Sequence, residues 1–251
     1  MKKFEFDKEK HAYKLDGKRM TGCTTIISIL DKPALVQWSA NMAVDYIKDN
    51  HRADFEVRKD KEVNGDYLVV SKDTLEEARK AWRIKRDKAG DIGTAVHDMI
   101  EMYVKAQING NRFQAKHQDE RVQKMFDKFV EWEKEENIKF LLSEQKLYSE
   151  KHWFAGTVDL IFEKDGKRFI GDIKTAKDIY QTNYIQMGGY DIMLEELGKL
   201  KDCAGYCVIN IPKQFKKDGS AKIKVKYLYN PEDHKEAFLN CLNLYRYINK
   251  K

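Results

Sequence analysis

Two aspartates and a lysine, Asp159, Asp172 and Lys174, have the residue types and spacing that metal-dependent phosphodiester chemistry requires. Hard divalent cations such as Mg²⁺ and Mn²⁺ prefer oxygen ligands, and they commonly bind one or two carboxylates together with a substrate phosphate. Two carboxylates that face each other on paired strands repel, so a cation held between them would offset that cost. This chemistry requires the fold to bring the three side chains together.

The two aspartates lie in segments that predict a β-hairpin. Residues 157–163 and 168–175 are rich in β-branched and aromatic side chains, which favour strands. The Asp165–Gly166 pair between them is typical of a two-residue turn. In the register that such a turn sets, Asp159 lies directly opposite Asp172, with roughly 5 Å between the Cβ atoms. A bulged turn would slip this register by one residue.

The alternation of side chains along a strand places Lys174 on the same face as the two aspartates. Ile161 and Ile170 share that face, and several other apolar residues point to the opposite side: Val158, Leu160, Phe162, Phe169 and Ile173. Apolar residues on both faces indicate strands that are covered on both sides, and covered carboxylates need partners. The alternative is that both aspartates lie on a solvated surface, as most carboxylates do.

Four short segments occur in the order typical of a known nuclease family: residues 93–97 (GTAVH), 156–161 (GTVDLI), 171–175 (GDIKT) and 186–190 (QMGGY). The sequence resembles the PD-(D/E)XK nuclease superfamily and, within it, the RecB-like branch, which includes phage-encoded exonucleases, mitochondrial genome-maintenance exonucleases and CRISPR-associated adaptation nucleases. Four motifs in order make a specific match, whereas a lone Asp-x-Lys would carry little weight.

The resemblance implies an α/β fold with a restriction-endonuclease-like core, in which helices flank a mixed central β-sheet. It also implies residue roles. Asp159 and Asp172 would bind a metal ion, Mg²⁺ or Mn²⁺, with the backbone carbonyl of Ile173 as a further ligand, and Lys174 would activate or orient the attacking water. His97 would be another metal ligand. Such a centre stabilises the charge that builds up on the scissile phosphate.

His97 and Glu101 lie four residues apart in a segment, residues 94–103, that predicts a helix, so they share one helix face. An isolated histidine is more often an ordinary, partly buried residue than a metal ligand. The Gly-Thr-x-x-His pattern reverses this preference. Glu101 is either a metal ligand or a carboxylate that orients His97.

Gln186 and Tyr190 have the same four-residue spacing in a helix that we predict from Asn183 to Leu197. The resemblance implies a catalytic role for the pair, but a structural hydrogen bond is an equal alternative because a buried Tyr hydroxyl needs a partner in any case. Gly188 and Gly189 each cost a helix roughly 1 kcal/mol relative to alanine. A close approach to the sheet or to nucleic acid would explain why this cost is tolerated.

The charge of the chain is modestly positive, with 47 Lys and Arg against 41 Asp and Glu among 251 residues, a net charge of +6 and a pI near 8.9. This balance fits a polyanionic partner but also many unrelated proteins. One predicted helix concentrates basic residues around a tryptophan: Arg79, Lys80, Trp82, Arg83, Lys85 and Arg86. We expect this basic segment to contact DNA through phosphate and stacking interactions. The alternative is a solvated helix face with Trp82 in the core.

The four cysteines are Cys23, Cys203, Cys207 and Cys241. No signal peptide or transmembrane segment is visible, which predicts a cytoplasmic, intracellular protein with reduced thiols and no membrane partner. Some relatives hold an iron–sulfur cluster with one cysteine before the nuclease motifs and three after them. Cys203 and Cys207, however, lie on a predicted strand about 13 Å apart, so their spacing argues against a cluster and favours small buried hydrophobic residues.

The remaining segments predict the surroundings of the site. We expect residues 1–90 to form an N-terminal hairpin and helical extension that includes the basic segment, and residues 91–251 to form the nuclease core. Apolar residues at helical spacing in residues 120–136 predict a helix that packs on the core. Residues 141–148 predict a strand, and Glu144 on it has either a structural or a catalytic role.

The function predicted from these features is a metal-dependent DNA exonuclease. It would hydrolyse single-stranded DNA or the ends of double-stranded DNA in recombination, repair or replication. The resemblance also raises the hypotheses of a phage origin and of a single-strand annealing or binding protein as a partner. The alternatives are a structure-selective or restriction-type endonuclease, a catalytically silent nucleic-acid-binding module, and an unrelated metal-binding or recombination-scaffold protein. Paired carboxylates argue against a silent module, because an inactive site has no reason to keep their repulsion.

Overall fold

The computed structural model describes residues 2–30, 33–50, 57–59, 66–68, 70–213 and 223–250. The chain forms two compact units, one made of Met1–Leu30 with Gly93–Lys251 and the other of Asp31–Ile92. The first thirty residues, which the sequence predicts as part of an N-terminal extension, lie in the unit that carries Asp159 and Asp172.

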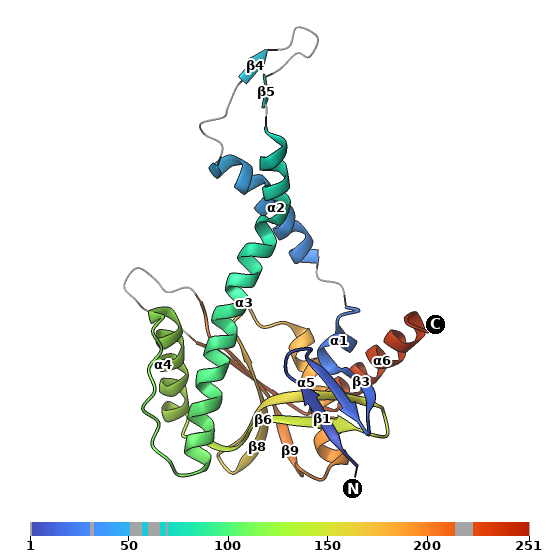
Figure 1. The fold of residues 1–251 in the computed structure, drawn as a ribbon. Helices are drawn as coiled ribbons and strands as arrows, with labels where there is room; N and C mark the ends of the chain where they lie inside the picture. Colours follow the sequence, from blue (N-terminus) through green and yellow to red (C-terminus); the bar gives the residue numbers. More distant parts are fainter. Residues whose placement is uncertain are drawn as a thin grey trace. The chain divides into compact units, whose positions relative to one another are not determined.

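A mixed sheet of eight strands is the centre of the larger unit (Figure 1). The strand order is β1-β2-β3-β7-β8-β9-β10, and β6 also pairs with β7. The strands are β1 (Phe4–Asp7), β2 (Ala12–Leu15), β3 (Lys18–Gly22), β6 (Lys139–Ser149), β7 (Phe154–Lys164), β8 (Lys167–Lys174), β9 (Cys203–Asn210) and β10 (Lys224–Tyr229). This arrangement, with helices on both sides, confirms the predicted α/β fold class.

The β7–β8 hairpin has the predicted register. Its pairs run from Lys164 opposite Lys167 to Leu160 opposite Gly171. The turn residues Asp165 and Gly166 have φ values of 50° and 71°, which is the left-handed conformation that a type I′ turn requires at both positions. The Asp-Gly sequence therefore fixes the pairing, which ends at Leu160 and Gly171, one pair before the predicted Asp159–Asp172 pair.

Strict alternation along β7 fails near Asp159. Val158 belongs to the same buried cluster as Ile161 and Ile170, although alternation predicts that it points to the opposite face. The reason is local: β8 leaves β7 after Leu160, and Glu144 on the neighbouring strand has a left-handed φ of 47°. Where two paired strands become irregular at the same position, their side chains can switch faces there, and the strands can still pair before and after that position.

Helices α1, α5 and α6 cover one face of the sheet, and α4 with the end of α3 covers the other (Figure 1). Among the buried residues on the α5 side are Met187, Tyr206 and Phe238. The bounds of these helices are α1 (Cys23–Ile27), α3 (Lys72–Ile108), α4 (Glu120–Glu135), α5 (Gln181–Glu196) and α6 (Glu232–Ile248). The helices thus bury both faces of the central strands, as their apolar composition predicts.

The predicted core helix is confirmed as α4. Its residues Phe129 and Trp132 are buried and contact Phe140 of β6 and Phe162 of β7. Each fully buried large apolar side chain contributes roughly 1.5–3 kcal/mol. This aromatic layer anchors the strands that carry Glu144 and Asp159.

The smaller unit contains α2 (Pro33–Asn50), the two-stranded sheet of β4 (Val57–Lys59) and β5 (Asp66–Leu68), and the first part of α3. Tyr46 of α2 donates a hydrogen bond to Glu77 of α3 within this unit. Helix α3 passes through the boundary between the two units at Ile92 and Gly93. Across the described ranges, every helix is too short or too polar to cross a membrane.

Candidate metal centre

One edge of β7 is shared by two different strands. β8 pairs with Leu160–Lys164, and β3 pairs with Phe154 and Ala155 farther along the same edge. Strand β6 occupies the other edge along nearly the whole length of β7. Among the pairs formed in the described part of the chain, residues 156–159 have no ladder partner on the shared edge. This gap between β3 and β8 is where Asp159 lies.

The Asp159 carboxylate replaces the missing ladder pair. Its Oδ2 accepts a hydrogen bond from the backbone N–H of Ile173 on β8, at 2.8 Å. The same oxygen lies 3.9 Å from Nδ1 of His97, too far for a hydrogen bond but close enough to share a ligand. The side chain is 14% exposed. Asp159 is therefore held by the sheet while part of its carboxylate stays accessible.

Asp172 is buried beside Lys174. The side chain of Asp172 is 1% exposed, and its Oδ1 accepts a hydrogen bond from Lys174 Nζ at 2.6 Å. Its Oδ2 is buried and, within the described residues, has no hydrogen-bond partner. Burial raises the pKa of Asp172, and the nearby Asp159 charge raises it further, whereas the Lys174 charge opposes both. A buried carboxylate oxygen without a partner is costly, so a cation placed there would relieve the cost.

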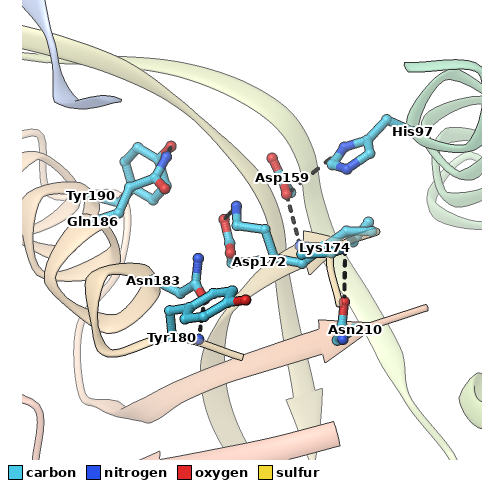
Figure 2. A network of polar contacts seen from close by, with 11 residues as sticks. His97, Asp159, Asp172, Lys174, Tyr180, Asn183, Gln186, Tyr190 and Asn210 are labelled. Atoms are coloured by element: carbon cyan, nitrogen blue, oxygen red, sulfur yellow. Dashed lines mark hydrogen bonds and ion pairs between the residues drawn. The ribbon is translucent and has the colours of Figure 1, made fainter. Parts of the chain in front are cut away.

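Lys174 remains an ammonium in this setting. Burial alone would lower its pKa, but the charges of Asp172 and Asp159 outweigh that effect and raise the pKa above its ordinary value. Its side chain is 23% exposed. The structure thus brings the predicted trio together, with Asp159 between His97 and the Asp172–Lys174 pair (Figure 2).

The structure places the two α3 residues differently. His97 points from the helix toward Asp159 (Figure 2). Glu101, one turn farther along, forms an ion pair with Lys105 on its own helix, with the Glu101 side chain 30% exposed. The helix therefore offers the His97 imidazole to the site, while the Glu101 carboxylate is occupied by a lysine. A role of Glu101 as a metal ligand stays a prediction.

Glu144 of β6 is a third acidic residue at the same place. Its neighbours Ser143 and Gln145 pair with Leu160 and Val158, so Glu144 itself lies opposite Asp159. His97, Glu144 and Asp159 each offer a ligand atom, and these atoms all lie within 4.8 Å of one another. Burial, together with the charge of Asp159, raises the pKa of Glu144 to about 8.

The role of Glu144 is open from the sequence alone, because its partner across the sheet is not evident there. A register shift between Phe140 and Leu142 sets which residue of β6 faces Asp159, and a bulge of this kind has no clear sequence signal. Glu144 lies among polar residues of the strand, Ser143, Gln145 and Lys146, so its local sequence does not mark it as a site residue.

Gln186 and Tyr190 are both buried on α5, close to the carboxylates. Gln186 Nε2 donates a hydrogen bond to the Tyr190 hydroxyl. Burial raises the pKa of Tyr190 well above its ordinary value, and the charges of Asp159 and Asp172 add to the shift. The Tyr190 ring packs over Gly156, where a Cβ atom would come within 2.8 Å of it. Tyr190 is therefore a protonated phenol fixed at the start of the gap in β7.

A family model for the PD-(D/E)XK nuclease superfamily matches residues 67–248, which is more than half of the chain. The chain belongs to the PD-(D/E)XK nuclease superfamily. No curated protein sequence matches it. Among solved structures, one similar chain, "Crystal structure of SSO0001", has 12% sequence identity and a TM-score of 0.30. That match covers 51% of this chain and 58% of SSO0001, so this chain spans less than two thirds of the other's length.

Members of this nuclease superfamily typically use divalent metal ions, and the residues present fit such an ion. The donor set of carboxylates with one imidazole suits a divalent cation. The orphaned Oδ2 of Asp172 is the decisive observation, because it is a buried acceptor that the described protein groups do not satisfy. Asp159, Asp172 and His97 are therefore the candidate holders of the metal.

The close approach that the paired glycines of α5 allow is to α6, and not to the sheet or to nucleic acid as the sequence suggested. A Cβ atom on Gly188 would lie 2.3 Å from the backbone carbonyl oxygen of His234, and one on Gly189 would lie 2.6 Å from the Phe238 ring. Both partners belong to α6. The glycines allow α5 and α6 to pack closely, and this contact could not be foreseen because it joins distant segments.

The basic segment belongs to the smaller unit of this nuclease. The guanidinium carbons of Arg83 and Arg86 lie 5.4 and 5.0 Å from the centre of the Trp82 ring, so Trp82 is half-buried beneath them. Arg79 pairs with Glu76 on the same helix. The remaining basic residues of the segment, Lys80 and Lys85, are exposed. DNA contact by this segment stays a prediction.

All four cysteines are free thiols. Cys23 and Cys241 lie in the buried cluster on the α5 side of the sheet, and Cys207 is buried on β9. Burial raises the pKa of each of these three thiols. Cys203 is half-buried on the same strand as Cys207. These thiols are protonated at neutral pH and act as small apolar side chains.

Proposed function

We propose that this nuclease is a DNA exonuclease that uses Mg²⁺ or Mn²⁺ and hydrolyses phosphodiester bonds from free ends. The observation that carries the proposal is the buried Asp172 oxygen without a partner, beside Asp159 and the Lys174 ammonium. A site of this kind is expensive for the fold unless a cation completes it. The superfamily to which the chain belongs supports the same chemistry.

In this proposal Asp159 and Asp172 hold the metal ion, with His97 and the backbone carbonyl of Ile173 as further ligands. When bound, the ion lowers the pKa of a water molecule and stabilises negative charge on the scissile phosphate. The hydrogen bond from the Ile173 N–H fixes the Asp159 carboxylate, so the ligand needs little reorganisation. Glu101 could act as a further metal ligand only if its ion pair with Lys105 breaks.

Lys174 has a separate role, which is to place a positive charge beside the reacting phosphate. Its raised pKa keeps the ammonium charged at neutral pH, and its Nζ is anchored on Asp172. An ammonium with three N–H donors can hold Asp172 and still orient a water or a phosphate oxygen. We therefore expect loss of the Lys174 ammonium to lower the rate of cleavage more than it lowers metal affinity.

Gln186 and Tyr190 complete the proposed site from α5. Gln186 donates its hydrogen bond to the Tyr190 oxygen, which leaves the phenolic proton free to donate elsewhere. Because the pKa of Tyr190 is well above its ordinary value, the hydroxyl is a donor throughout the neutral range. We propose that it donates toward the carboxylates or the DNA backbone and so sets the orientation of the acidic pair.

DNA as the substrate rests on the chemistry of the basic segment. Exposed lysines and arginines around Trp82 suit a phosphate backbone with stacked bases. A role in recombination, repair or replication inside the cell, with a single-strand annealing or binding protein as partner, belongs to the same proposal. Copurification from cells is the test of that partner.

The proposal is tested with end-labelled linear DNA and covalently closed circular DNA, each incubated with Mg²⁺, Mn²⁺ or EDTA. We expect digestion of linear DNA from its ends, no digestion in EDTA, and loss of activity in Asp159→Ala and Lys174→Ala. Glu163→Gln is the matched control, because it removes a charge from the far end of the same hairpin. Cutting of closed circles at the rate of linear DNA would instead identify an endonuclease, and binding without turnover a silent module.

A further inference from the structure

Glu144 has a backbone conformation that a glutamate seldom adopts inside a strand. Its φ of 47° lies in the left-handed region, in the middle of the eleven-residue strand β6. Residues other than glycine, asparagine and aspartate rarely occupy this region, and such outliers concentrate at functional sites. The side chain of Glu144 lies beside Asp159, the residue opposite it in the β6–β7 register.

The Glu144 carboxylate has acidic neighbours and no compensating partner. One of its oxygens, a ring nitrogen of His97 and an oxygen of Asp159 all lie within 4.8 Å of one another. Among the described residues, its carboxylate forms neither a hydrogen bond nor an ion pair, and Lys105, whose charge acts on it, is bound to Glu101. Two carboxylates that close together repel unless a cation lies between them.

An independent observation lies on the other side of Asp159. There the Oδ2 atom of Asp172, in a side chain that is 1% exposed, is buried without a described partner. Figure 2 shows Asp159 between Asp172 and His97. Acceptors without a protein partner therefore occur on both sides of Asp159 among the described residues, and Lys174 forms its ion pair with Asp172.

We propose that Glu144 is a metal ligand that, together with His97 and Asp159, holds a divalent cation. This inference rests on the proposed metal-dependent function and adds to it a residue outside the four sequence motifs. Imidazole is a ligand of transition metals, whereas Mg²⁺ and Ca²⁺ prefer oxygen ligands alone. A set of two carboxylates and one imidazole therefore favours Mn²⁺ over Mg²⁺ at this position.

A purely structural role for Glu144 makes a different prediction. A glutamate that only fills space would be replaced by glutamine with no effect on metal binding, because the two side chains have the same shape and differ in charge. A ligand that contributes its negative charge would lose affinity on the same change. Metal affinity therefore distinguishes the two roles, whereas activity alone would not.

The test is titration of the metal-free protein with Mn²⁺ and, separately, with Mg²⁺, with binding measured by calorimetry and by the electron paramagnetic resonance signal of free Mn²⁺. We expect Glu144→Gln to weaken Mn²⁺ binding by at least about tenfold. Glu163→Gln, the same change on β7 away from the site, should bind both metals like the wild type. An unchanged Mn²⁺ affinity in Glu144→Gln would overturn the proposal.

Two further measurements keep the result interpretable. Wild-type crystals soaked in Mn²⁺ should show an anomalous peak within ligand distance of a Glu144 oxygen; a peak that contacts other residues but not Glu144 would overturn the proposal even if Glu144→Gln failed to fold. Asp159→Asn and Asp172→Asn test the underlying function separately. If these two variants cleave DNA like the wild type, the proposed function fails; if they are inactive and Glu144→Gln keeps its Mn²⁺ affinity, only the role of Glu144 fails.

Discussion

The backbone N–H of Ile173 donates a hydrogen bond of 2.8 Å to Oδ2 of Asp159, at the point where the β7–β8 ladder ends. A side-chain oxygen thus takes the place of a backbone acceptor. The same oxygen lies 3.9 Å from His97, so the end of the hairpin and helix α3 meet at one carboxylate. The position of the candidate metal centre therefore depends on the register of the hairpin, which the Asp165–Gly166 turn sets.

Asp172→Asn should abolish the stabilisation that a divalent metal gives to the folded protein. A ligand that binds only the folded state at 100 times its dissociation constant adds about 2.7 kcal/mol to the free energy of unfolding. The wild type should therefore melt at a higher temperature with Mn²⁺ than with EDTA. Glu163→Gln should keep this shift; a full shift in Asp172→Asn would show that Asp172 does not hold the metal.

Asp191 gives the stability of the protein a pH dependence. Burial raises its pKa from 3.8 to about 6, even though the Tyr206 hydroxyl donates a hydrogen bond to it and Lys235 lies 3.9 Å away. Between pH 4 and 6 the folded protein retains the Asp191 proton after the unfolded chain has lost it. Below about pH 4 this group therefore adds roughly 2–3 kcal/mol to the free energy of unfolding. That contribution is lost as the pH rises through 6.

The check is urea unfolding at several pH values between 4 and 7 for the wild type and Asp191→Asn. The variant should lack this part of the decrease in unfolding free energy, because asparagine does not titrate. Lys235 keeps its ion pairs with Glu195 and Glu232 in the variant. Parallel pH profiles for the two proteins would contradict the prediction.

Gly188→Ala should destabilise the protein by roughly 2–3 kcal/mol. The new Cβ atom would lie 2.3 Å from the carbonyl oxygen of His234, and a backbone atom in α6 cannot move away as a flexible side chain can. Gly90→Ala is the control, because nothing lies within 4 Å of its Cβ position in α3. That change should be neutral or stabilise by up to about 1 kcal/mol. Thermal unfolding followed by circular dichroism distinguishes the two, and equal effects would refute the close packing of α5 on α6.

Trp82→Ala should weaken the binding of single-stranded DNA by roughly tenfold, since stacking on an aromatic ring contributes about 1–3 kcal/mol per base. Fluorescence anisotropy in EDTA measures binding without cleavage. Ile84→Ala removes an exposed apolar side chain of the same helix, 53% exposed, and should leave affinity unchanged. Wild-type affinity in Trp82→Ala would assign the basic segment to a solvated surface.

The sequence predicts local features of this site well. The Asp165–Gly166 turn sets the hairpin register, and the apolar periodicity of residues 120–136 predicts α4, because both depend on residues close together in the chain. That register brings Asp159, Asp172 and Lys174 to the same end of the hairpin, although the ladder itself ends at Leu160 and Gly171. Interactions between residues close together in the sequence are therefore enough to predict these elements.

Features that join distant segments could not be predicted. Strand β3 enters the main sheet through a parallel pair with Phe154 and Ala155, and only this pairing creates the gap in which Asp159 lies. Glu144 faces Asp159 because of a register shift in β6, and Gly188 meets α6 through tertiary packing. Each depends on contacts whose partners a local pattern does not specify.

The most direct measurement is the single-turnover rate at which Asp159→Asn cleaves end-labelled linear DNA at saturating Mn²⁺, compared with the wild type. Loss of a carboxylate that binds the metal and is fixed by the Ile173 N–H should lower the rate at least ~100-fold, while the metal-free variant stays folded by circular dichroism. Cleavage by folded Asp159→Asn at the wild-type rate would contradict a metal centre built on Asp159 and Asp172.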